Sequence, residues 1–470
     1  MRFPHWTGAD LVAATGGERV CGSADAEFSE IGIDSRAIAA SAVFVAIRGE
    51  RHDGHRFAPA VVDGGVRGLV VARDALPDLP VAQWQSAGVV CVAVNDTTQA
   101  LGALAAFHRR RAGVNVAAIT GSNGKTSTRV LTAAVLEQRF SVLATRGNLN
   151  NEIGVPLTLF RLASDHQWAV LELGMNHPGE IGRLTAICEP RIGAITNIGP
   201  AHLQGVGSME GVLRAKAELV EGMPSGGRAV LNVDDPRLRR LGAELDRPVT
   251  WFGRSPEADV RAEAEVESGA GLAFSLALPD GRVPVRLPLM GRFQVLNALA
   301  AAAVGHLAGL GPETIAAGLS VGRPEKGRMV RVDTRRGIHL IDDTYNANPA
   351  SMAAAVETLT SLAPAGQRVL VMGDMLELGP EAPALHREAG RRAVAAGVDR
   401  LLACGPLSGE VAAGAKAAGL PADRVETGPP EALVTELTTT LRANDWVLIK
   451  GSRGMAMERI LNLLREWADR

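Results

Sequence analysis

Short apolar runs with glycine-rich connections characterise the first part of the chain. AVFVAI (42–47), GLVVA (68–72) and VVCVAV (89–94) each have the length and the β-branched content of a buried strand. A charged segment, FHRRRAGVN (107–115), follows these runs and is a suitable place for a domain boundary. The pattern therefore predicts a small α/β unit at the start of the chain.

From residue 114 the apolar runs alternate with helical stretches. The strand-like runs are VNVAAIT (114–120), SVLAT (141–145), AVLELG (169–174), IGAITNI (192–198) and RAVLN (228–232). This alternation predicts a mostly parallel sheet with helices on both faces. Residues 258–288 alternate more like antiparallel strands, and RFQVLNALAAAAVGHLAGL (292–310) is typical of a long buried helix.

A second boundary is predicted at GRPEKGRM (322–329), after which the strand–helix alternation resumes. The later strand-like runs are HLIDDTY, RVLVMGDM, RLLACG and WVLIKGS. Because these runs also alternate with helical stretches, they predict another α/β domain. We therefore predict an α/β protein of three domains that span residues 1–112, 113–322 and 323–470.

Composition removes several classes of function. The 470 residues are 46% hydrophobic and carry a formal net charge of −2, so no basic surface for nucleic acid or for an anionic membrane is expected. No apolar run has the length of a membrane helix, and MRFPHWTGADL lacks the apolar stretch of a signal peptide. The four cysteines are far apart in the sequence and contain no CxxC pair, as in a reducing cytosol. We expect a cytoplasmic monomer.

Lysine is scarce in this chain. Lysine and arginine together number 49, and the lysines are Lys125, Lys216, Lys326, Lys416 and Lys450. A lysine that persists against this preference is a candidate for chemistry that a guanidinium cannot perform. Tyrosine is scarcer still, with Tyr345 alone.

A strand, a glycine-rich turn and a helix in succession predict a phosphate-binding loop. The turn and the start of the helix comprise Gly121, Ser122, Asn123, Gly124, Lys125, Thr126 and Ser127. Glycines allow backbone N–H groups to surround phosphate oxygens, while Lys125 can reach the β- and γ-phosphates and Thr126 can ligate Mg²⁺. Ile119 stands where the longer GxxxxGK[ST] pattern has a glycine. The alternative is a tight turn with a solvent-exposed lysine.

Three further residues could act beside this loop, each with a plainer alternative. Glu172 ends an apolar strand, which suits a Mg²⁺ ligand, although an exposed glutamate at a sheet edge is the alternative. His202 follows another strand, but a lone histidine is more often structural and is an unusual Mg²⁺ ligand. Lys216 lies on a predicted helix, where a solvated charge is common, yet a lysine amine can be carbamylated to a metal-binding anion.

Two segments are unusually rich in amide side chains. Residues 145–160 include Asn148, Asn150 and Asn151, which is more amide groups than a helix cap needs. DDTYNANPASM (342–352) places Asp343, Tyr345, Asn346 and Asn348 at a strand end. The second segment could be an ordinary turn before a helix capped by Asn348, but its density of hydrogen-bonding groups favours a ligand site.

Together these segments resemble the Mur ligases, the ATP-dependent amide-forming enzymes of peptidoglycan precursor synthesis. The segments that carry the resemblance are TGSNGKT, GNLNNEIGVPLTL, LELGMNHPGEI, NIGPAHL, RAKAEL, DDTYNANPASM, GDMLELG and KGSRGMAMERI. GNLNNEIGVPLTL and YNANPASM are similar to the branch of the family that attaches D-alanyl-D-alanine. The first domain is similar more weakly, through DSRAIAASAVFVAIRGERHDGH (34–55).

The resemblance implies a nucleotide-binding first domain, a P-loop-type ATPase domain and a Rossmann-like ligase domain. It implies ATP-dependent joining of UDP-N-acetylmuramoyl-tripeptide to D-alanyl-D-alanine through an acyl phosphate. Lys125 and Thr126 would bind phosphate and Mg²⁺, while Glu172, His202 and a carbamylated Lys216 would support the metal ions. ATP would also contact Asn297, Arg328 and Asp343. The uridine nucleotide would contact Asp34, Ser35, Arg36, Ala46, Arg48 and residues 52–55, and the muramoyl-peptide would contact Asn148, Asn150 and Asn151. The dipeptide would contact Tyr345, Asn346, Asn348, Ser452 and Arg453.

Three other functions fit part of the pattern. Another ligase of the same fold, adding a different amino acid or glutamate to folate, is disfavoured by the asparagine-rich segments. A phosphate-loop switch or motor would hydrolyse nucleotide without an amine acceptor. A binding protein that had lost catalysis is disfavoured because Lys125, Glu172, His202 and Lys216 occur together.

Overall fold

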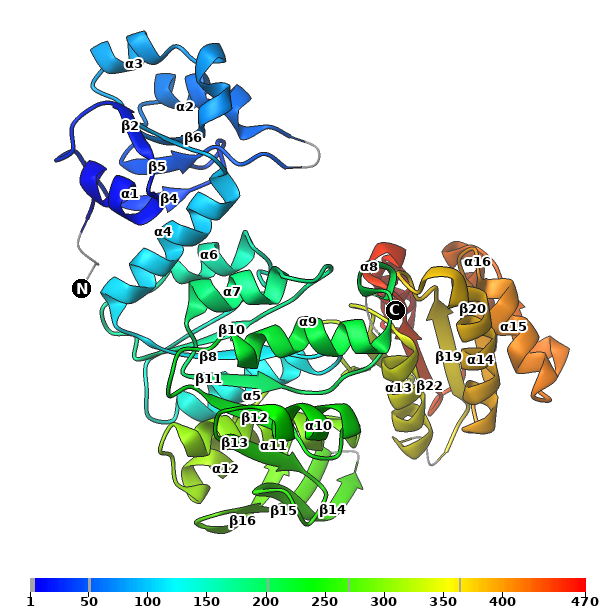
Figure 1. The fold of residues 1–470 in the computed structure, drawn as a ribbon. Helices are drawn as coiled ribbons and strands as arrows, with labels where there is room; N and C mark the ends of the chain where they lie inside the picture. The colour runs from blue at the N-terminus through cyan, green and yellow to red at the C-terminus, as the bar shows by residue number, and fades with distance from the viewer. Residues whose placement is uncertain (1–4, 50–51, 201–202, 269–270, 363–364) are drawn as a thin grey trace.

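The computed structural model describes residues 5–49, 52–200, 203–268, 271–362 and 365–470. Three lobes follow one another along the chain, and Figure 1 shows the first (blue) and the last (yellow to red) attached to a larger central lobe. Mixed α/β structure in each lobe confirms the predicted fold class. Within the described ranges, no helix is both long enough and apolar enough to cross a membrane.

The first lobe is built on a sheet whose strands lie in the order β2-β7-β6-β5-β4. The predicted runs form β5, β6 and β7, which pair in parallel, while β2 adds antiparallel to β7. Alternate residues of β5 face two different apolar clusters, with Val43 and Val45 on one side and Phe44 on the other. The elements are β1 (Trp6–Thr7), α1 (Gly8–Thr15), β2 (Glu18–Cys21), β3 (Glu27–Phe28), β4 (Glu30–Gly32), β5 (Ala42–Val45), a 3₁₀ helix (Gly54–Phe57), α2 (Ala58–Asp63), β6 (Gly68–Ala72), a 3₁₀ helix (Arg73–Asp78), α3 (Val81–Ser86), β7 (Val90–Val94) and α4 (Thr97–Ala112).

Helix α4 joins the first lobe to the central one. It continues through the charged segment predicted as a boundary and ends at Gly113, whose φ of 63° only glycine adopts freely. Arg109 is buried in this segment and pairs with Glu189 of the central lobe at 2.7 Å. Trp6 of the first lobe stacks on His108, which in turn contacts Phe160. The charged segment is therefore the packed end of a helix.

The central lobe contains a sheet in the order β16-β15-β14-β13-β12-β11-β8-β10-β9. Strands β8 to β14 pair in parallel and β14, β15 and β16 pair antiparallel, as the sequence predicted. Ala117 and Ile119 of β8 face α5, α11 and α12, whereas Val116 and Ala118 face α6, α7 and α9. The elements are β8 (Asn115–Thr120), α5 (Lys125–Leu136), β9 (Val142–Ala144), α6 (Gly154–Leu159), β10 (Trp168–Glu172), α7 (Glu180–Cys188), β11 (Ile192–Ile195), α8 (Leu203–Val206), α9 (Met209–Glu221), β12 (Arg228–Asn232), α10 (Pro236–Glu244), β13 (Val249–Gly253), β14 (Val260–Ser268), β15 (Gly271–Leu278), β16 (Gly281–Leu287), α11 (Phe293–Leu307) and α12 (Pro312–Val321).

The last lobe is a second parallel sheet with one antiparallel edge, in the order β17-β18-β22-β19-β20-β21. Its predicted runs form β18, β19, β20 and β22. Helices α13, α14 and α15 contribute to the apolar cluster on one face, and α16 and α17 contribute to the cluster on the other. The elements are β17 (Val330–Asp333), β18 (His339–Asp343), α13 (Pro349–Leu362), β19 (Arg368–Gly373), a 3₁₀ helix (Gly379–Glu381), α14 (Ala382–Ala395), β20 (Arg400–Cys404), α15 (Ser408–Ala417), a 3₁₀ helix (Ala422–Arg424), β21 (Val425–Thr427), α16 (Pro430–Thr440), β22 (Trp446–Lys450), a 3₁₀ helix (Arg453–Met455) and α17 (Glu458–Ala468).

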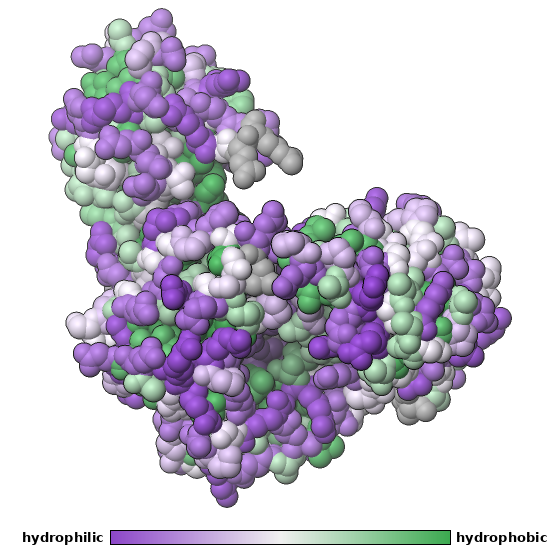
Figure 2. Space-filling model, turned by 45° about the vertical axis from the view of Figure 1, so that its right-hand side comes forward, coloured by the Kyte–Doolittle hydropathy of each residue, from purple (hydrophilic) through white to green (hydrophobic). Residues whose placement is uncertain are grey.

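The linker between the central and last lobes, residues 322–329, has no helix or strand. Figure 2 shows that these two lobes meet over a hollow, while an open notch separates the first lobe from the last. The carboxyl ends of β8, β10 and β11 in the central sheet, and of β18 and β22 in the last sheet, face this junction. In open α/β sheets, ligands bind at the carboxyl ends of parallel strands.

Candidate active site

The glycine-rich turn between β8 and α5 has the conformation that its sequence predicts. Gly121 has φ 147° and Gly124 has φ 82°. A Cβ at these positions would lie 1.9 Å from Thr196 Oγ1 and 2.2 Å from Asn297 Oδ1, respectively. Both positions therefore require glycine, because the neighbouring side chains fill the space that any other residue would need.

Lys125 is the first residue of α5 and folds back over the turn. Its Nζ donates to the Gly121 carbonyl at 2.7 Å. Burial lowers the pKa of the Lys125 amine, an effect that the Glu172 carboxylate opposes and Arg328 reinforces. Lys125 is half-buried and its amine is bound to the loop, so the alternative of a solvent-exposed lysine on a tight turn is wrong.

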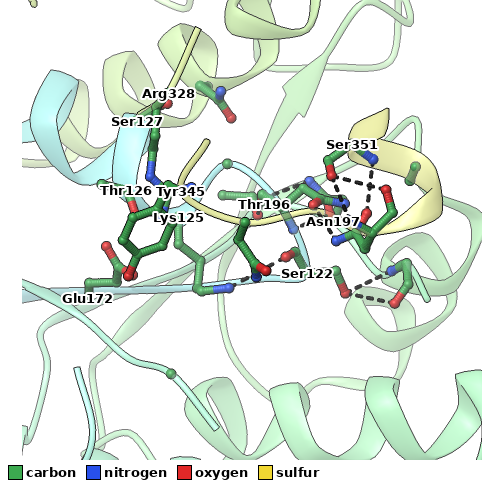
Figure 3. A pocket seen from close by; sticks show the side chains of 18 of the residues that line it. Ser122, Lys125, Thr126, Ser127, Glu172, Thr196, Asn197, Arg328, Tyr345 and Ser351 are labelled. Carbon is green, nitrogen blue, oxygen red and sulfur yellow. Dashed lines mark hydrogen bonds between the residues drawn. The ribbon is translucent and has the colours of Figure 1, made fainter. Parts of the chain in front are cut away.

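The neighbouring strand end braces the loop (Figure 3). The Asn197 side chain accepts from the Asn123 N–H and donates to the Asn123 carbonyl, both at 3.0 Å. Thr196 Oγ1 donates to the same carbonyl at 2.6 Å, and Ser122 Oγ donates to the Gly199 carbonyl at 2.9 Å. These contacts fix the loop before any ligand arrives, which reduces the entropy lost on binding.

Glu172 ends β10 and is only 2% exposed, so the alternative of a glutamate at an exposed edge is wrong. Its Oε1 accepts from Asn150 Nδ2 at 2.9 Å. Its Oε2 is buried and accepts no hydrogen bond within the described residues, although Arg129 Nε lies 3.7 Å away. An oriented carboxylate oxygen with spare capacity is available to a further ligand.

Arg129 connects this carboxylate to the interlobe linker. It lies one turn after Lys125 on α5, is buried, and pairs with Glu172 and with Glu325. Sequence reasoning missed both Arg129 and Glu325. The i, i+4 spacing from Lys125 is a signal that could have identified Arg129, because it places both cations on one face of the helix.

The asparagines of residues 148–151 line the same space but have different partners. Asn150 orients Glu172, and Asn151 Oδ1 accepts from the Gly154 N–H at 2.8 Å at the start of α6. Asn148 also lines the cavity, and its carbonyl accepts from the Asn150 N–H at 2.8 Å. Two of the three amide side chains thus support neighbouring groups, and the Asn148 side chain has no hydrogen-bond partner within the part of the chain that the structure describes.

Lys216 lies on α9 with 1% of its surface exposed, so it is not a solvated helix charge. Burial, with a smaller contribution from the Lys125 ammonium, lowers the pKa of the Lys216 amine well below its usual value. A neutral amine is the form that can be carbamylated. His202 lies outside the described residues.

The last lobe contributes the strand ends of β18 and β22. Asp343 ends β18, and its Oδ2 accepts from Lys450 Nζ at 2.6 Å. The Arg328 guanidinium lies 4.1 Å from the centre of the Tyr345 ring. Asn348 Oδ1 accepts from the Ser351 N–H at 2.9 Å and so caps α13, as the plainer alternative proposed. Sequence reasoning missed Lys450, although its scarcity as a lysine was a usable signal.

A direct contact between the lobes joins the two halves of the site. Asn348 Nδ2 donates to Asn123 Oδ1 at 2.7 Å, so the last lobe touches the phosphate loop. Beside Gly124 of the loop, Asn297 Nδ2 donates to Gln294 Oε1 at 2.8 Å, and both side chains are buried. Asn348 therefore both caps a helix and contacts the phosphate loop.

These groups line one cavity of about 540 Å³ between the central and last lobes. The sequence-predicted residues in its lining are Ser122, Asn123, Gly124, Lys125, Thr126, Ser127, Asn148, Asn150, Asn151, Glu172, Asn297, Arg328, Asp343, Tyr345, Asn346 and Asn348. Gly121 and Lys216 are not part of this lining. The cavity brings together groups from segments that are far apart in the sequence.

Two predicted residues of the last lobe lie outside this lining. Ser452 Oγ accepts from the Leu376 N–H at 2.8 Å and donates to the Ala347 carbonyl at 3.3 Å. Arg453 is exposed and pairs with Glu458 at 3.2 Å. In this arrangement Ser452 braces the cavity-lining loop from behind, and Arg453 faces solvent.

The residues predicted for the uridine nucleotide are in the first lobe, apart from the cavity. Arg36 is exposed and its hydrogen bond lowers the pKa of Asp34 to about 2, while Ser35 lies in the turn between them. Ala46 is fully buried in this lobe. Arg48 pairs with Asp74 at 2.7 Å and with Asp53 at 3.5 Å.

His55 completes this group in the first lobe. Its Nδ1 lies 2.6 Å from Asp53 Oδ1, and its Nε2 accepts from the Ala72 N–H at 2.8 Å. The ring therefore donates to Asp53 and is fixed in one orientation. Burial raises the pKa of the Asp53 carboxyl, but the two hydrogen bonds from His55 and the charges of His55 and Arg48 together outweigh burial, and the pKa is lowered.

The donor set fits Mg²⁺. The buried Glu172 Oε2 accepts no hydrogen bond from the described residues, and Thr126, in the same cavity lining, is also buried. Mg²⁺ prefers oxygen ligands and is usually bound by one or two carboxylates together with substrate phosphates. No cluster of three histidine, cysteine or acidic side chains occurs among the described residues.

Family models match the chain in all three lobes. Residues 27–109 match "Mur ligase family, catalytic domain", residues 119–305 match "Mur ligase middle domain", and residues 327–453 match "Mur ligase, glutamate ligase domain". These matches include the phosphate loop, Glu172, the interlobe linker from residue 327 and the strand ends of the last lobe.

Two curated relatives are similar over nearly their whole length, and each is named UDP-N-acetylmuramoyl-tripeptide–D-alanyl-D-alanine ligase. The one from Escherichia coli (strain K12) is 39% identical over 447 residues, which is 94% of this chain and 95% of the relative. The one from Bacillus subtilis (strain 168) is 34% identical and covers 93% of each chain.

Solved structures agree with this similarity. MurF from Acinetobacter baumannii superposes with a TM-score of 0.89 at 33% identity, covering 99% of this chain and 100% of that one. A MurF ligase from Thermotoga maritima in complex with ADP has a TM-score of 0.83 at 26% identity, covering 93% of this chain and 97% of that one. The chain therefore belongs to the Mur ligase family.

Proposed function

We propose that this enzyme joins D-alanyl-D-alanine to UDP-N-acetylmuramoyl-tripeptide with hydrolysis of ATP, giving UDP-N-acetylmuramoyl-pentapeptide in the cytoplasm. The observation that carries the proposal is the single cavity lined by the phosphate loop on one side and by the strand ends of the last lobe on the other. A ligase must bring a triphosphate, a carboxylate and an amine together, and this cavity offers groups suited to each.

The triphosphate would bind at the start of α5. Backbone N–H groups of the loop and the helix dipole favour an anion there, and Lys125 would exchange its bond to the Gly121 carbonyl for one to phosphate. Asn297 of α11, which lines the cavity, would contact the base. Arg328 and Asp343 would contact the phosphates or ribose from the linker and the last lobe.

The metal site would use oxygens that the structure leaves available. Thr126 and Glu172 would hold Mg²⁺ together with His202, and the ion would neutralise phosphate charge as it accumulates. Carbamylation of the neutral Lys216 amine by CO₂, with loss of one proton, would add a carboxylate to this group. Asn150 would keep Glu172 in orientation, because its amide occupies the other carboxylate oxygen.

The reaction requires positioning rather than a protein nucleophile. The terminal carboxylate of the tripeptide attacks the γ-phosphorus, ADP leaves, and an acyl phosphate forms. The amine of D-alanyl-D-alanine then attacks the carbonyl carbon, and the tetrahedral intermediate expels inorganic phosphate as the amide forms. Lys125 and Arg328 are cations of the cavity lining and would stabilise the negative charge of the transferred group.

The substrates would approach from the outer lobes. We propose that residues 1–112 bind the uridine nucleotide through Ser35, Arg36, Ala46 and Arg48, and that residues 323–470 bind the dipeptide. Asn148, Asn150 and Asn151 of the central domain, 113–322, would face the muramoyl-peptide. Tyr345, Asn346 and Asn348 would contact the dipeptide directly, with Ser452 and Arg453 behind or beside them.

The test is phosphate release from Mg·ATP with and without each co-substrate, using tripeptides that carry lysine or diaminopimelate at the third position. Release that needs both co-substrates, with the pentapeptide product seen by mass spectrometry, is expected. The Lys125→Ala variant should lose this release, whereas Lys416→Ala, at an exposed position on α15, should keep it. Release without the dipeptide, or no release from folded protein, would overturn the proposal.

A further inference from the structure

Lys450, the last residue of β22, lies in the cavity lining and has none of the roles assigned above. It is 2% exposed, and its Nζ donates to Asp343 Oδ2 at 2.6 Å and to the Asn346 carbonyl at 2.8 Å. Its strand partner at this position is Asp343 itself, because β22 and β18 pair in parallel register. A buried ammonium with two specific acceptors is a fixed point in the structure.

The first acceptor, Asp343, is hydrogen-bonded to the interlobe linker. Asp343 Oδ1 accepts from the Met329 N–H at 3.2 Å, and Asp342 Oδ2 accepts from the Gly327 N–H at 3.0 Å. The two carboxylates thus bind the backbone on both sides of Arg328. Met329 has φ 51° and Gly327 has φ 77°, so this stretch is a strained turn that needs external support.

The second acceptor, the Asn346 carbonyl, belongs to the loop that lines the cavity. Binding of the Asn346 carbonyl fixes the loop between Tyr345 and Asn348. Tyr345 packs under the Arg328 guanidinium at 4.1 Å, and Asn348 reaches Asn123 of the phosphate loop at 2.7 Å. One ammonium therefore connects the two segments that the last lobe extends toward the nucleotide.

We propose that Lys450 is a positioning residue for nucleotide binding, which sets the place of Arg328 through Asp343 and the place of Asn348 through Asn346. This inference rests on the proposed function, since it concerns the nucleotide site of that enzyme.

The geometry explains why lysine stands here in a chain that otherwise prefers arginine. The two acceptors converge on one point, at 2.6 and 2.8 Å from a single nitrogen. A guanidinium presents its donors as a planar fork around a larger head group. In the buried space at the end of β22, that head group would displace either the Asp343 carboxylate or the Asn346 carbonyl.

The experiment measures binding of β,γ-methylene-ATP by calorimetry, without turnover. Lys450→Gln, which keeps a donor but loses the charge, should bind about tenfold more weakly, the size expected for one lost charge-assisted hydrogen bond. Arg328→Ala should also weaken binding, and adding K450Q to it should weaken binding less than K450Q weakens it in the wild type, because one of the two routes from Lys450 passes through Arg328. Lys416→Gln, at an exposed position, is the matched control and should bind like the wild type.

Amide hydrogen exchange at residues 327–329 provides a second readout. Exchange should become faster in K450Q but not in K416Q, because the bond that fixes Asp343 is lost. If K450Q does not fold, Lys450→Arg is measured instead, since it keeps the charge opposite Asp343 and should also bind the analogue more weakly.

Unchanged affinity in K450Q or K450R, or full additivity with R328A, would overturn the inference. A wild-type protein that does not bind the analogue would instead overturn the proposed function. The two failures are thus distinguishable.

Discussion

Replacing Lys216 by methionine should make the protein more stable and less active. The lysine side chain is 1% exposed, and its amine has no hydrogen-bond or ion-pair partner within the described residues. Burying an amine without a partner costs free energy, whereas methionine has similar length and no polar atom. We therefore expect K216M to be the more stable protein near pH 7 in buffer free of CO₂.

The magnitude follows from proton linkage. Burial lowers the pKa of the Lys216 amine in the folded state, so at pH values between the folded and the unfolded pKa the unfolded chain binds one more proton than the folded chain. The free-energy cost of burying the Lys216 amine is largest at pH values below its pKa in the folded state. It shrinks as the pH rises and disappears near the ordinary lysine value of about 10.4. At pH values between the folded and the unfolded pKa of Lys216, the difference in free energy of unfolding between K216M and wild type should narrow by about 1.4 kcal/mol per pH unit.

A free energy of unfolding is well defined only for a two-state transition, and a protein of three lobes need not unfold in one. The assay therefore measures the number of protons bound on unfolding. Calorimetric unfolding at pH 8 in two buffers of different ionisation enthalpy gives the number of protons bound on unfolding. Wild type should bind one more proton than K216M. Lys416→Met, at an exposed position, is the control and should match the wild type in this comparison.

Bicarbonate extends the test to the proposed carbamate. Added ¹³C-bicarbonate should give a carbamate resonance and higher stability in wild type, and neither in K216M, whose ligase activity should be lost at every pH. An equal proton count in the two proteins, or a K216M variant less stable than wild type in CO₂-free buffer, would refute the reasoning about burial.

Two further predictions concern the phosphate loop. Gly124→Ala and Gly113→Ala should each cost about 1–2 kcal/mol of strain because both positions have positive φ. Only G124A should also bind β,γ-methylene-ATP more than tenfold more weakly, because its Cβ would collide with Asn297. Calorimetry that gives G124A and G113A the same affinity would contradict this prediction. Asn348→Ala should be about 1 kcal/mol less stable than Asn348→Ser, which retains a helix cap, while both raise the KM for ATP similarly by losing the bond to Asn123. A KM for ATP that rises in Asn348→Ala but not in the more stable Asn348→Ser would contradict the role of the bond to Asn123.

The sequence predicted the fold where the hydrophobic pattern was unambiguous. The long apolar runs became the central strands β5 to β8, β10 to β12 and β18 to β22, except for the short β21. The unpredicted strands are mostly short edge elements such as β2, β4 and β17, whose apolar residues are few and whose pairing is set by tertiary contacts. The charged segment 107–115 likewise gave no sign that Arg109 would be buried against Glu189, because a partner 80 residues away leaves no local pattern.

The candidate site was predictable to the extent that its groups belong to recognisable segments. The phosphate loop and Glu172 could be placed because a strand end fixes both their location and their direction. Arg129, Glu325 and Lys450 were missed because their roles depend on contacts between lobes, which spacing along the chain does not reveal. The roles of the predicted residues in binding and catalysis stay predictions until they are measured.

The lysines show how a compositional bias can be converted into a structural argument. Lys326 and Lys416 are exposed, and changing either to arginine should alter nothing, because a solvated cation needs only its charge. The other three meet requirements that arginine cannot. Lys125 folds a point donor back onto its own loop, Lys216 is buried where the pKa of its amine is lowered, and Lys450 serves two acceptors from one nitrogen. In a chain that otherwise uses arginine, the lysines that are not exposed therefore mark positions where a compact or deprotonatable cation is required.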